Sequence, residues 1–361
     1  MNPAQLVSFT PSRQIFAPSG TGSSEIAFGI EYVIVDSTLN GLIVSDRYAA
    51  VEYLPSEHPG HDVKRLALLF PGGLGDSVAL KACIESIERD STLYPNLKSI
   101  TIFSTMGDKD LFLDGAIRKY EIAVLPYPPL RRLLSQFDGV IGFGAIQRQS
   151  VNDELTDSFA DVLQIPRPTV HATLRPKGRT KRVWENFFSS SNKRVAINTY
   201  SRAHYRSIPP VLSAKIAFGL SKENIDVYLM GSQGQRIPFS RNINGNKIQC
   251  MPPPGIYDVA GMCDELEEYI VFMDLMDGII CPDTFALHAA GCLEKPTVAL
   301  FGLTSSLSRS RYFPTVKVIQ GDADCSPCNI IASTPDCGYS HCKAMDSIEP
   351  TKVVEMIKEM I

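Results

Sequence analysis

The sequence predicts an α/β protein made of two doubly wound domains, each a parallel sheet with helices on both faces, that face each other across a cleft. Three observations support this fold class. From Arg65 onward, short apolar runs alternate with longer stretches of helical periodicity, which is the order of strands and helices in a parallel sheet. Prolines, a run of Lys and Arg and three consecutive serines interrupt the alternation at residues 166–194. A second alternating series then fills the rest of the chain.

The composition is that of a globular protein with two cores. The chain has 361 residues, of which 44% are hydrophobic and 20% are charged, which suits two domains of ordinary size. Its formal net charge of −4 argues against a protein that holds nucleic acid by overall positive charge. No apolar run approaches the roughly 18 residues that a membrane helix needs, and the first residues lack the basic-then-apolar order of a signal peptide. We therefore expect a cytoplasmic protein without a membrane span.

Residues 1–62 are predicted to form a β-rich N-terminal extension. Residues 25–36 and 42–54 are rich in β-branched and aromatic residues and flank a turn at 37–41, which fits a β-hairpin or a small sheet. An exposed hairpin can dock on another subunit, so a homo-oligomer formed through the extension is one interpretation. The other interpretation is a lid that covers the extension's own domain.

Residues 63–170 are predicted to form the first doubly wound domain. Its strands are expected at 66–70, 100–104, 122–125 and 139–144. Its helices are expected at 76–88, 108–119, 130–136 and 153–163.

A glycine-rich turn joins the first strand of this domain to its first helix, with the sequence Pro71-Gly72-Gly73-Leu74-Gly75-Asp76. Gly73 and Gly75 allow the backbone to approach a bound ligand closely, so they are candidate donor-binding residues. Asp76 is predicted to lie at the start of the helix and to face the cleft. It is either a general base for an incoming hydroxyl group or a simple helix cap.

Residues 171–194 are predicted to be the linker, and residues 195–361 the second domain. Strands are expected at 195–199, 227–230, 248–251, 278–281, 297–301 and 316–319. Helices are expected at 210–220, 264–276, 284–293 and 350–360. The basic residues of the linker region are Arg175, Lys177, Arg179, Lys181, Arg182, Lys193 and Arg194. Such a run either attracts an anionic acceptor, such as a phosphorylated lipid core or a nucleic acid, or is an ordinary solvated face.

The segment from Cys281 to Tyr312 is the strongest functional signal in the second domain. It predicts a buried strand, a sharp turn at Pro282-Asp283-Thr284, a helix of small residues and a second buried strand. Asp283 or Thr284 can cap the helix. The helix N-terminus points out of the carboxyl end of the sheet, where its unpaired N–H groups favour an anion. We expect a nucleotide diphosphate to bind there.

Two arginines follow the first strand of the second domain, in the loop from Asn198 to Arg206. Arg202 and Arg206 are candidates to clamp a leaving diphosphate, because guanidinium groups pair bidentately with phosphate oxygens. The alternative is that both are solvated loop residues.

The glycine-rich turn, the stretch from Asp283 to Thr304 and the Cys-rich C-terminal region together resemble glycosyltransferase family 9, the ADP-heptose heptosyltransferases, over roughly residues 65–361. The resemblance implies a GT-B fold of two Rossmann-like domains: an N-terminal acceptor domain and a C-terminal nucleotide-sugar domain. It also implies transfer with inversion and no metal at the reaction centre. The leading β structure is similar in architecture to the branch of heptosyltransferase-like enzymes that glycosylate proteins.

The resemblance also assigns roles to individual residues. Asp76 takes the position of the family's catalytic base. The family's donor nucleotide and phosphate site corresponds to Asp283, Thr284 and His288, and Thr304 ends the matching stretch. Phe285 stands where the family has a glycine that lets the backbone close on the donor, so the identity of the donor depends on this position.

Four cysteines cluster near the C-terminus, Cys325, Cys328, Cys337 and Cys342. Four thiolates in a turn-rich segment suit a tetrahedral Zn or Fe site that holds a loop together. His341 is an alternative ligand, and reduced thiols or disulfides are the alternative to a metal. Members of the family often carry a similar cluster, and some related protein glycosyltransferases bind iron there, so a structural role is expected.

The sequence therefore predicts an inverting glycosyltransferase that moves a heptose or similar sugar from a nucleotide diphosphate sugar to an acceptor hydroxyl. The acceptor is a glycan in this interpretation. One alternative is a glycosyltransferase that acts on a protein or on modified DNA bases. A second alternative is an inactive nucleotide-binding or assembly module in which Phe285 has closed the donor site.

Overall fold

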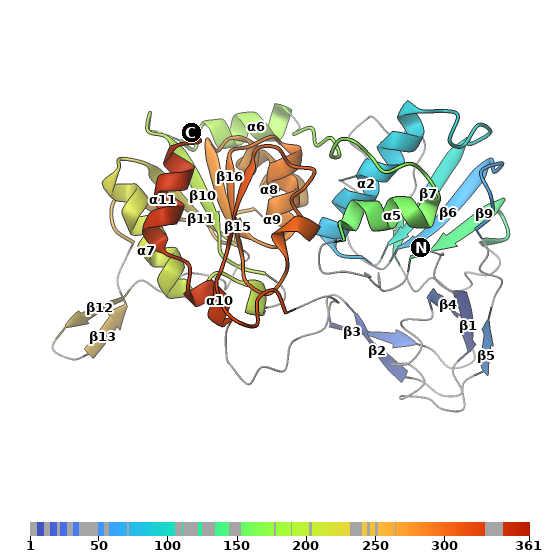
Figure 1. Ribbon diagram of the computed structural model, residues 1–361, viewed down its shortest axis with the longest axis horizontal. Coiled ribbons are helices and arrows are strands. Elements are labelled where there is room, and N and C mark those ends of the chain that lie inside the picture. Colours follow the sequence, from blue (N-terminus) through green and yellow to red (C-terminus); the bar gives the residue numbers. More distant parts are fainter. Residues whose placement is uncertain are drawn as a thin grey trace. The chain divides into compact units, whose positions relative to one another are not determined.

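The structure is a computed structural model of the 361-residue chain (Figure 1). The described residues are 6–10, 15–19, 22–26, 32–35, 50–53, 58–70, 72–104, 111, 122–124, 134–143, 153–176, 178–188, 190–201, 204–231, 240–243, 246–249, 252–263, 265–328 and 342–361. The chain divides into two compact units, residues 1–147 with 155–168, and residues 148–154 with 169–361. None of the described helices combines the length and the apolar character needed to cross a membrane.

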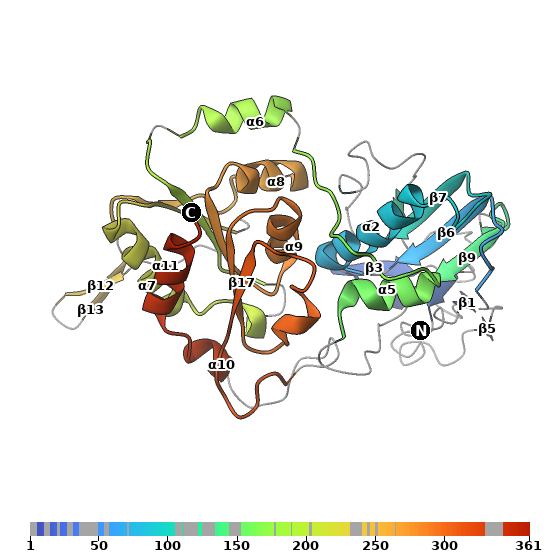
Figure 2. The same cartoon turned by 45° about the horizontal axis from the view of Figure 1, so that its top comes forward.

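The first unit contains a four-stranded parallel sheet, which confirms the predicted type of sheet. Its order is β8-β7-β6-β9, with β6 Arg65–Phe70, β7 Ser99–Ser104, β8 Ile122–Val124 and β9 Gly139–Gly142. Helices α2 (Leu74–Arg89) and α5 (Leu155–Leu163) pack against each other along this sheet (Figure 2). The helices expected at 108–119 and 130–136 lie almost wholly outside the described residues.

Three phenylalanines form the centre of the first unit's core. The ring of Phe70 lies 5.7 Å from that of Phe143 and 5.5 Å from that of Phe159, edge to face in both cases. Such pairs contribute about 0.5–1.5 kcal/mol each beyond the area they bury. The Phe70 ring also explains the glycine that follows, because a Cβ on Gly72 would lie 2.3 Å from the ring. The core therefore determines the start of the glycine-rich turn.

The N-terminal residues form five short strands, β1 Leu6–Thr10, β2 Ile15–Ser19, β3 Gly22–Ile26, β4 Tyr32–Val35 and β5 Ala50–Tyr53. The strands β2 and β3 form a hairpin, while β4 and β5 both pair with β1 in an antiparallel sheet of order β4-β1-β5. The predicted hairpin between residues 25–36 and 42–54 is therefore wrong, and the small sheet is the alternative that is found. Strand β1 lies between β4 and β5, which therefore do not pair with each other.

The second unit contains a six-stranded parallel sheet of order β14-β11-β10-β15-β16-β17. Its strands are β10 Arg194–Asn198, β11 Asp226–Met230, β14 Ile256–Asp258, β15 Gly278–Pro282, β16 Thr297–Phe301 and β17 Val316–Gln320. The chain builds outward from β10 in one direction and from β15 in the other. The strand order therefore reverses between β10 and β15, and ligands of open α/β sheets bind at the carboxyl ends of strands at such a switch point.

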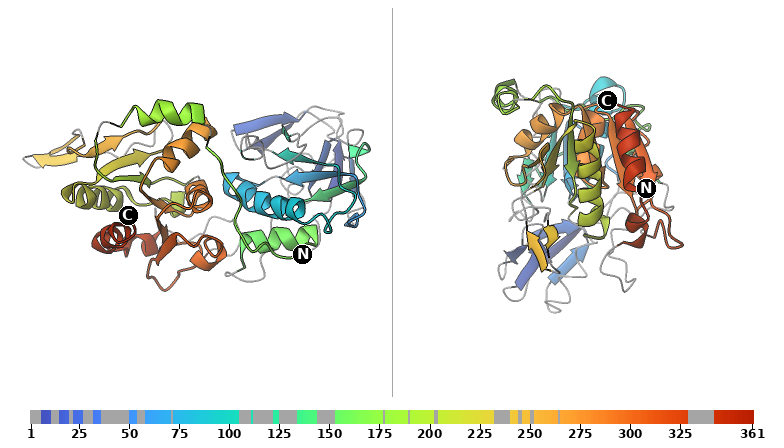
Figure 3. Two further views of the ribbon diagram at one scale, coloured as in Figure 1. Left: turned by 90° about the horizontal axis from the view of Figure 1, so that it is seen from above. Right: turned by 90° about the vertical axis from the view of Figure 1, so that its left-hand side faces the viewer.

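Helices cover both faces of this sheet (Figure 3). Helix α7 (Pro210–Lys222) packs beside α11 (Pro350–Lys358) on one face, and α8 (Leu266–Asp274) packs beside α9 (Phe285–Cys292) on the other. Two short 3-10 turns lie at His204–Arg206 and Ser306–Ser308, and a short helix α10 at Lys343–Asp346. Parallel sheets are thus found in both units, as the sequence predicts, and the sheet of the second unit has helices on both faces.

One expected strand of the second sheet is wrong. Residues 246–249 form β13, which pairs with β12 (Ser240–Ile243) in a separate antiparallel hairpin. The edge of the sheet is β14 instead, which follows three prolines, Pro252 to Pro254. Prolines lack the N–H group that a sheet ladder needs, so the ladder begins only after them.

The residues expected to form a linker, 171–194, include helix α6 (Gly178–Glu185). This helix packs on α8, where Trp184 meets Phe272 with ring centroids 5.0 Å apart. Lys181 Nζ lies 2.6 Å from Asp274 Oδ2 on the same helix. Lys193 and Arg194 likewise face Asp277, at 3.2 and 3.8 Å. Three basic side chains of this region therefore have acid partners, although Lys193 and Arg194 share one, so the positive field of the region is reduced but not cancelled.

Candidate active site

The polar residues of the second unit gather at the carboxyl edge of its sheet, at the switch point between β10 and β15. Asn198 ends β10, and Asp283 and Thr284 directly follow β15. Strand β16 ends at Phe301, and the loop after it carries Thr304 and Arg309. Because parallel strands end at one edge of a sheet, residues distant in the sequence meet there.

Thr284 caps helix α9. Its backbone is extended, and its Oγ1 accepts a hydrogen bond from the N–H of Ala286 at 3.1 Å. Asn198 Nδ2 lies 3.3 Å from the same oxygen and also donates to the carbonyl of Tyr200 at 3.1 Å. Of the two caps expected from the sequence, the structure therefore selects Thr284.

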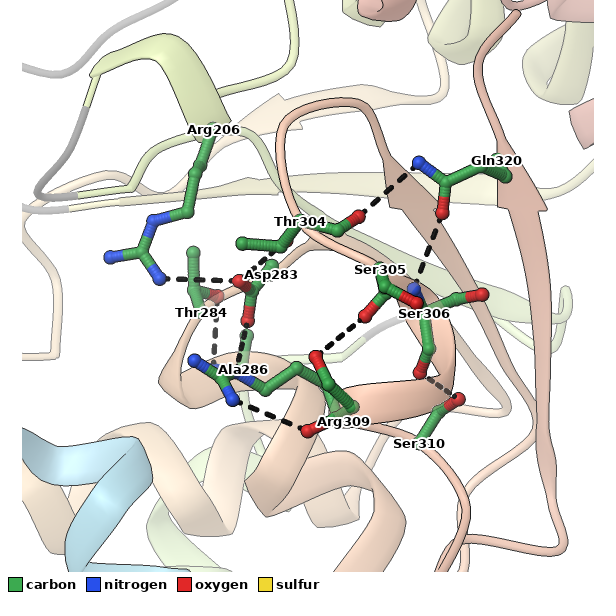
Figure 4. Close-up of polar contacts among 11 residues, drawn as sticks. Arg206, Asp283, Thr284, Ala286, Thr304, Ser305, Ser306, Arg309, Ser310 and Gln320 are labelled. Carbon is green, nitrogen blue, oxygen red and sulfur yellow. Dashed lines mark hydrogen bonds and ion pairs between the residues drawn. The ribbon is translucent and has the colours of Figure 1, made fainter. Parts of the chain in front are cut away.

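Asp283 has a different role. Its side chain is buried, with 3% exposed, and lies between two arginines (Figure 4). Oδ2 accepts hydrogen bonds from Thr304 Oγ1 at 2.8 Å and Arg206 Nη1 at 3.3 Å, and Oδ1 lies 3.4 Å from Arg309 Nε. Two guanidinium groups thus share one carboxylate, which leaves an excess of one positive charge beside the N-terminus of α9.

The loop that carries Arg309 is held by hydrogen bonds. Gln320, the last residue of β17, accepts from the N–H of Ser306 at 3.2 Å and donates to the carbonyls of Gly302 and Thr304 at 3.3 and 3.2 Å. Within the loop, Ser308 Oγ donates to the carbonyl of Ser305 at 2.8 Å. The loop is therefore ordered around Asp283 before any ligand binds.

Tyr269 on α8 extends the network behind the α9 cap. Its hydroxyl donates to Asn198 Oδ1 at 3.1 Å. Burial raises the pKa of Tyr269 well above its ordinary value, so the hydroxyl stays protonated and remains a donor. Its ring also lies 5.9 Å from that of Phe285, the first residue of α9. Phe285 therefore leans toward α8.

His288 lies one turn further along α9 and is buried, with 4% exposed. Its ring meets Phe313 edge to face, 5.8 Å away. The Phe313 ring occupies the space beside Gly291, where a Cβ would lie 2.3 Å from it. The buried face of α9 thus holds His288 by packing, and its expected role at the donor site stays a prediction.

In the first unit, the glycine-rich turn ends in half of a capping box, because the N-cap Gly73 has no side chain to complete it. Helix α2 begins at Leu74, two residues before the expected start, and Gly73 is the N-cap. The N–H of Gly73 donates to Asp76 Oδ2 at 2.8 Å. Among the described residues, none donates to the other oxygen, Oδ1. Asp76 is thus a helix cap with one oxygen available, while Gly75 lies within the first turn of the helix.

A comparison with protein families identifies the family to which the chain belongs. A model of glycosyltransferase family 9 (heptosyltransferase) matches residues 145–337, more than half of the 361-residue chain. The chain belongs to glycosyltransferase family 9. The resemblance seen in the sequence is thereby confirmed, and the protein is a glycosyltransferase. Arg206, Asp283, Thr304 and Arg309 all lie within the matched residues.

Solved structures confirm the GT-B fold of this glycosyltransferase. The ADP-heptose LPS heptosyltransferase II of E. coli has a TM-score of 0.61 and 15% identity, with 82% of this chain and 98% of that chain covered. A family 9 glycosyltransferase from Veillonella parvula has a TM-score of 0.59 and 12% identity, with 83% and 97% covered. These identities are low, so the likeness concerns the fold. No curated protein matches the chain.

A further solved structure covers nearly the whole glycosyltransferase. The iron-containing, dodecameric heptosyltransferase TibC from enterotoxigenic E. coli, in complex with ADP-D-β-D-heptose, has a TM-score of 0.59 and 11% identity. The comparison covers 99% of this chain and 92% of that chain. It therefore includes the N-terminal strands.

The cysteine cluster is only partly described. Cys325 and Cys328 are exposed in the turn after β17, the N–H of Cys328 donates to the carbonyl of Leu303 at 3.0 Å, and Cys342 is buried beside Gly302. Cys337 and His341 lie outside the described residues. Within the described ranges, no three His, Cys, Asp or Glu side chains form a group that could hold a metal. The pair Cys325 and Cys328 has the spacing of half a tetrahedral site, and the metal stays a prediction.

The sequence pointed to Arg206, Asp283, Thr284 and Thr304, and the structure brings these four together. Arg202, another expected donor residue of this edge, lies outside the described residues. Sequence reasoning missed Arg309, Asn198, Tyr269 and Gln320. The available signal for Asn198 and Gln320 was a polar residue at the carboxyl end of an apolar strand.

Proposed function

We propose that this glycosyltransferase transfers a heptose or similar sugar from a nucleoside diphosphate sugar to an acceptor hydroxyl with inversion. The single observation that carries the proposal is the charge arrangement at Asp283, where two arginines meet one carboxylate beside the N-terminus of α9. A site with excess positive charge at the positive end of a helix dipole suits a diphosphate. In this proposal the second unit binds the donor and the first unit binds the acceptor.

The donor's diphosphate is the leaving group, and it gains negative charge as the bond to the anomeric carbon breaks. Arg206 has one described partner, Asp283, and five N–H donors, so most of its donors are available to phosphate oxygens. Arg202 is proposed to act with it from the same loop, and the positive end of the α9 dipole at Thr284 to add to their charge. Fixed positive groups that are aimed at developing charge need no metal to lower the barrier.

Asp76 is proposed as the general base. It takes the proton of the acceptor hydroxyl as the acceptor oxygen forms its bond to the anomeric carbon and the diphosphate leaves with the electron pair of the broken bond. The N–H of Gly73 fixes the orientation of the carboxylate through Oδ2, and Oδ1 accepts no hydrogen bond from the described part of the chain. A carboxylate anchored by one oxygen leaves the other to accept a proton.

The donor is identified by a mass-spectrometric hydrolysis screen over ADP-, UDP-, GDP- and CDP-sugars, because water is a poor acceptor that still reveals the donor. With that donor, Asp76→Asn is expected to bind as tightly as the wild type in calorimetry and to lose transfer by about 10²–10⁴-fold. Wild-type turnover in Asp76→Asn would refute the base assignment. If none of the nucleotide sugars binds, the proposed function is refuted and an assembly module is favoured.

A protein acceptor is the second candidate. The observation that favours it is the N-terminal sheet, because the comparison with the dodecameric TibC covers 99% of this chain and that with the LPS heptosyltransferase II covers 82%. We propose that the extension supports an oligomer and a different acceptor from the lipopolysaccharide core. The pairing of Lys181, Lys193 and Arg194 with acids makes a DNA acceptor the weaker alternative.

A further inference from the structure

We propose that Arg309 is a second diphosphate-binding residue, and that Asp283 holds Arg206 and Arg309 together as a clamp. The proposal rests on the proposed function and deepens it, because it names the group that balances the charge of the leaving diphosphate. Arg309 lies in the serine-rich loop after β16, within the segment 281–312 but at a position that the sequence did not single out as a donor contact.

The geometry joins the two arginines through separate oxygens of one carboxylate. Arg206 Nη1 lies 3.3 Å from Asp283 Oδ2, and Arg309 Nε lies 3.4 Å from Oδ1. Figure 4 shows both guanidinium groups on the side of Asp283 where Thr284 begins α9. An anion that meets the helix N-terminus therefore meets both cations as well.

The charges at this site do not balance without a ligand. Asp283 contributes one negative charge, and the two arginines contribute two positive charges. The side chains of Asp283 and Arg309 are largely buried, with 3% and 13% exposed, so water screens their charges less than at the surface. Two cations that share one acid repel each other, and a diphosphate relieves this repulsion.

Arg309 also keeps hydrogen-bond donors for a ligand. Among the described residues its partners are Asp283 and the carbonyl of Ser308, which accepts from Nη1 at 3.2 Å. A guanidinium group carries five N–H donors, so donors remain for phosphate oxygens. Gln320 and the serines of the loop already fix the backbone on which Arg309 stands. Binding therefore requires little additional ordering.

The opposite edge of the same sheet provides a matched control. Asp277 directly precedes β15, as Asp283 directly follows it, and it also faces two cations, Lys193 Nζ at 3.2 Å and Arg194 Nε at 3.8 Å. That cluster lies at the amino end of the strands, where parallel sheets do not bind ligands. Arg194→Gln thus removes one of two cations from an acid at the other end of β15, away from the donor site.

The test measures the affinity of the full chain for nucleoside diphosphates (ADP, UDP, GDP and CDP) by calorimetry at several salt concentrations. We expect Arg309→Gln to weaken binding by roughly ten- to a hundredfold, the loss of a charge-assisted hydrogen bond, and to make the salt dependence shallower. Arg309→Lys is expected to recover part of the affinity and of the salt dependence. Arg194→Gln is expected to keep both.

The outcomes separate this inference from the proposed function. Wild-type affinity and salt dependence in Arg309→Gln, with a wild type that binds a nucleoside diphosphate, would overturn the role of Arg309 and leave the proposed function standing. A wild type that binds none of the diphosphates would overturn both. If Arg309→Gln does not fold, Arg309→Lys decides. A partial loss of affinity in Arg309→Lys supports the role, and wild-type affinity in Arg309→Lys or a tenfold loss in Arg194→Gln contradicts it.

Discussion

At the scale of single residues, the adjacent polar side chains Asp283 and Thr284 divide two tasks between them. Both residue types cap helices well, so the sequence alone leaves open which of them caps α9. The choice depends on tertiary contacts, because Arg206, 77 positions away along the chain, engages the carboxylate. The threonine hydroxyl then accepts the N–H of Ala286. The site's residues were predictable from their position after buried strands, but their partners were not.

Removal of the α9 cap is expected to destabilise the protein. Thr284→Ala loses the hydrogen bond from Ala286 and the contact with Asn198, so we expect the free energy of unfolding to fall by about 1 kcal/mol. Urea denaturation measures this change. Thr284→Ser keeps a hydroxyl at the same position and is expected to retain most of the stability. Equal losses in the two variants would show that the methyl group, and not the cap, is responsible.

At the scale of elements, long apolar strands were predictable and short or polar elements were not. Strand β16 lies at residues 297–301 as expected, because a strand buried on both faces is continuously apolar. Strand β14 has three residues, of which only Ile256 is buried, so it carries almost no sequence signal. Helix α6 is rich in Arg and Lys, and it is anchored by Trp184 and by acids on α8. Its folding depends on contacts that its own sequence does not contain.

The corner where residues 58–62 meet the end of α5 is expected to be sensitive to acid. His58 Nδ1 accepts from the N–H of Gly60 at 3.1 Å, so the neutral ring carries its proton on Nε2, which lies 3.2 Å from the carbonyl of Leu163. Tyr94 shares that carbonyl at 3.0 Å. Burial lowers the pKa of His58 below 6.5. The hydrogen bond to Leu163 raises this pKa and the nearby His61 lowers it, but burial has the largest effect. A second proton on Nδ1 would displace the Gly60 hydrogen bond.

The sign of the effect follows from the lowered pKa. Between the folded pKa and 6.5, the unfolded chain binds more protons at His58 than the folded chain does. Stability is therefore full above this window and falls as the pH drops through it. We expect the difference in melting temperature between wild type and His58→Gln to be constant above pH 7 and to shrink as the pH falls below about 6.5. A difference that is the same at all pH values would contradict this role of His58.

At the scale of the whole molecule, the residues of the proposed chemistry are divided between the two units. We call the group formed by Asp283 and its three partners the charged cluster: Arg206, Asp283, Thr304 and Arg309. All four residues belong to the second unit, and Asp76 belongs to the first. The fold class was predictable because alternating apolar and amphipathic stretches specify a parallel sheet locally. The strand order of the N-terminal sheet was not, since β1 pairs with both β4 and β5 and antiparallel register among short strands depends on contacts distant in the sequence.

The N-terminal sheet is expected to determine the oligomeric state. In the order β4-β1-β5, both β4 and β5 are edge strands, and an open edge presents unpaired N–H and C=O groups that can pair with another chain. We expect the full chain to exceed the mass of a monomer in light scattering, and a variant that lacks residues 1–57 to return to the monomer. Because the charged cluster lies wholly in the second unit, this variant is expected to keep its affinity for nucleoside diphosphates, which also shows that it is folded. A monomeric full chain would show that the sheet forms no subunit contacts. An assembly unchanged by the deletion would place the subunit contacts elsewhere in the chain.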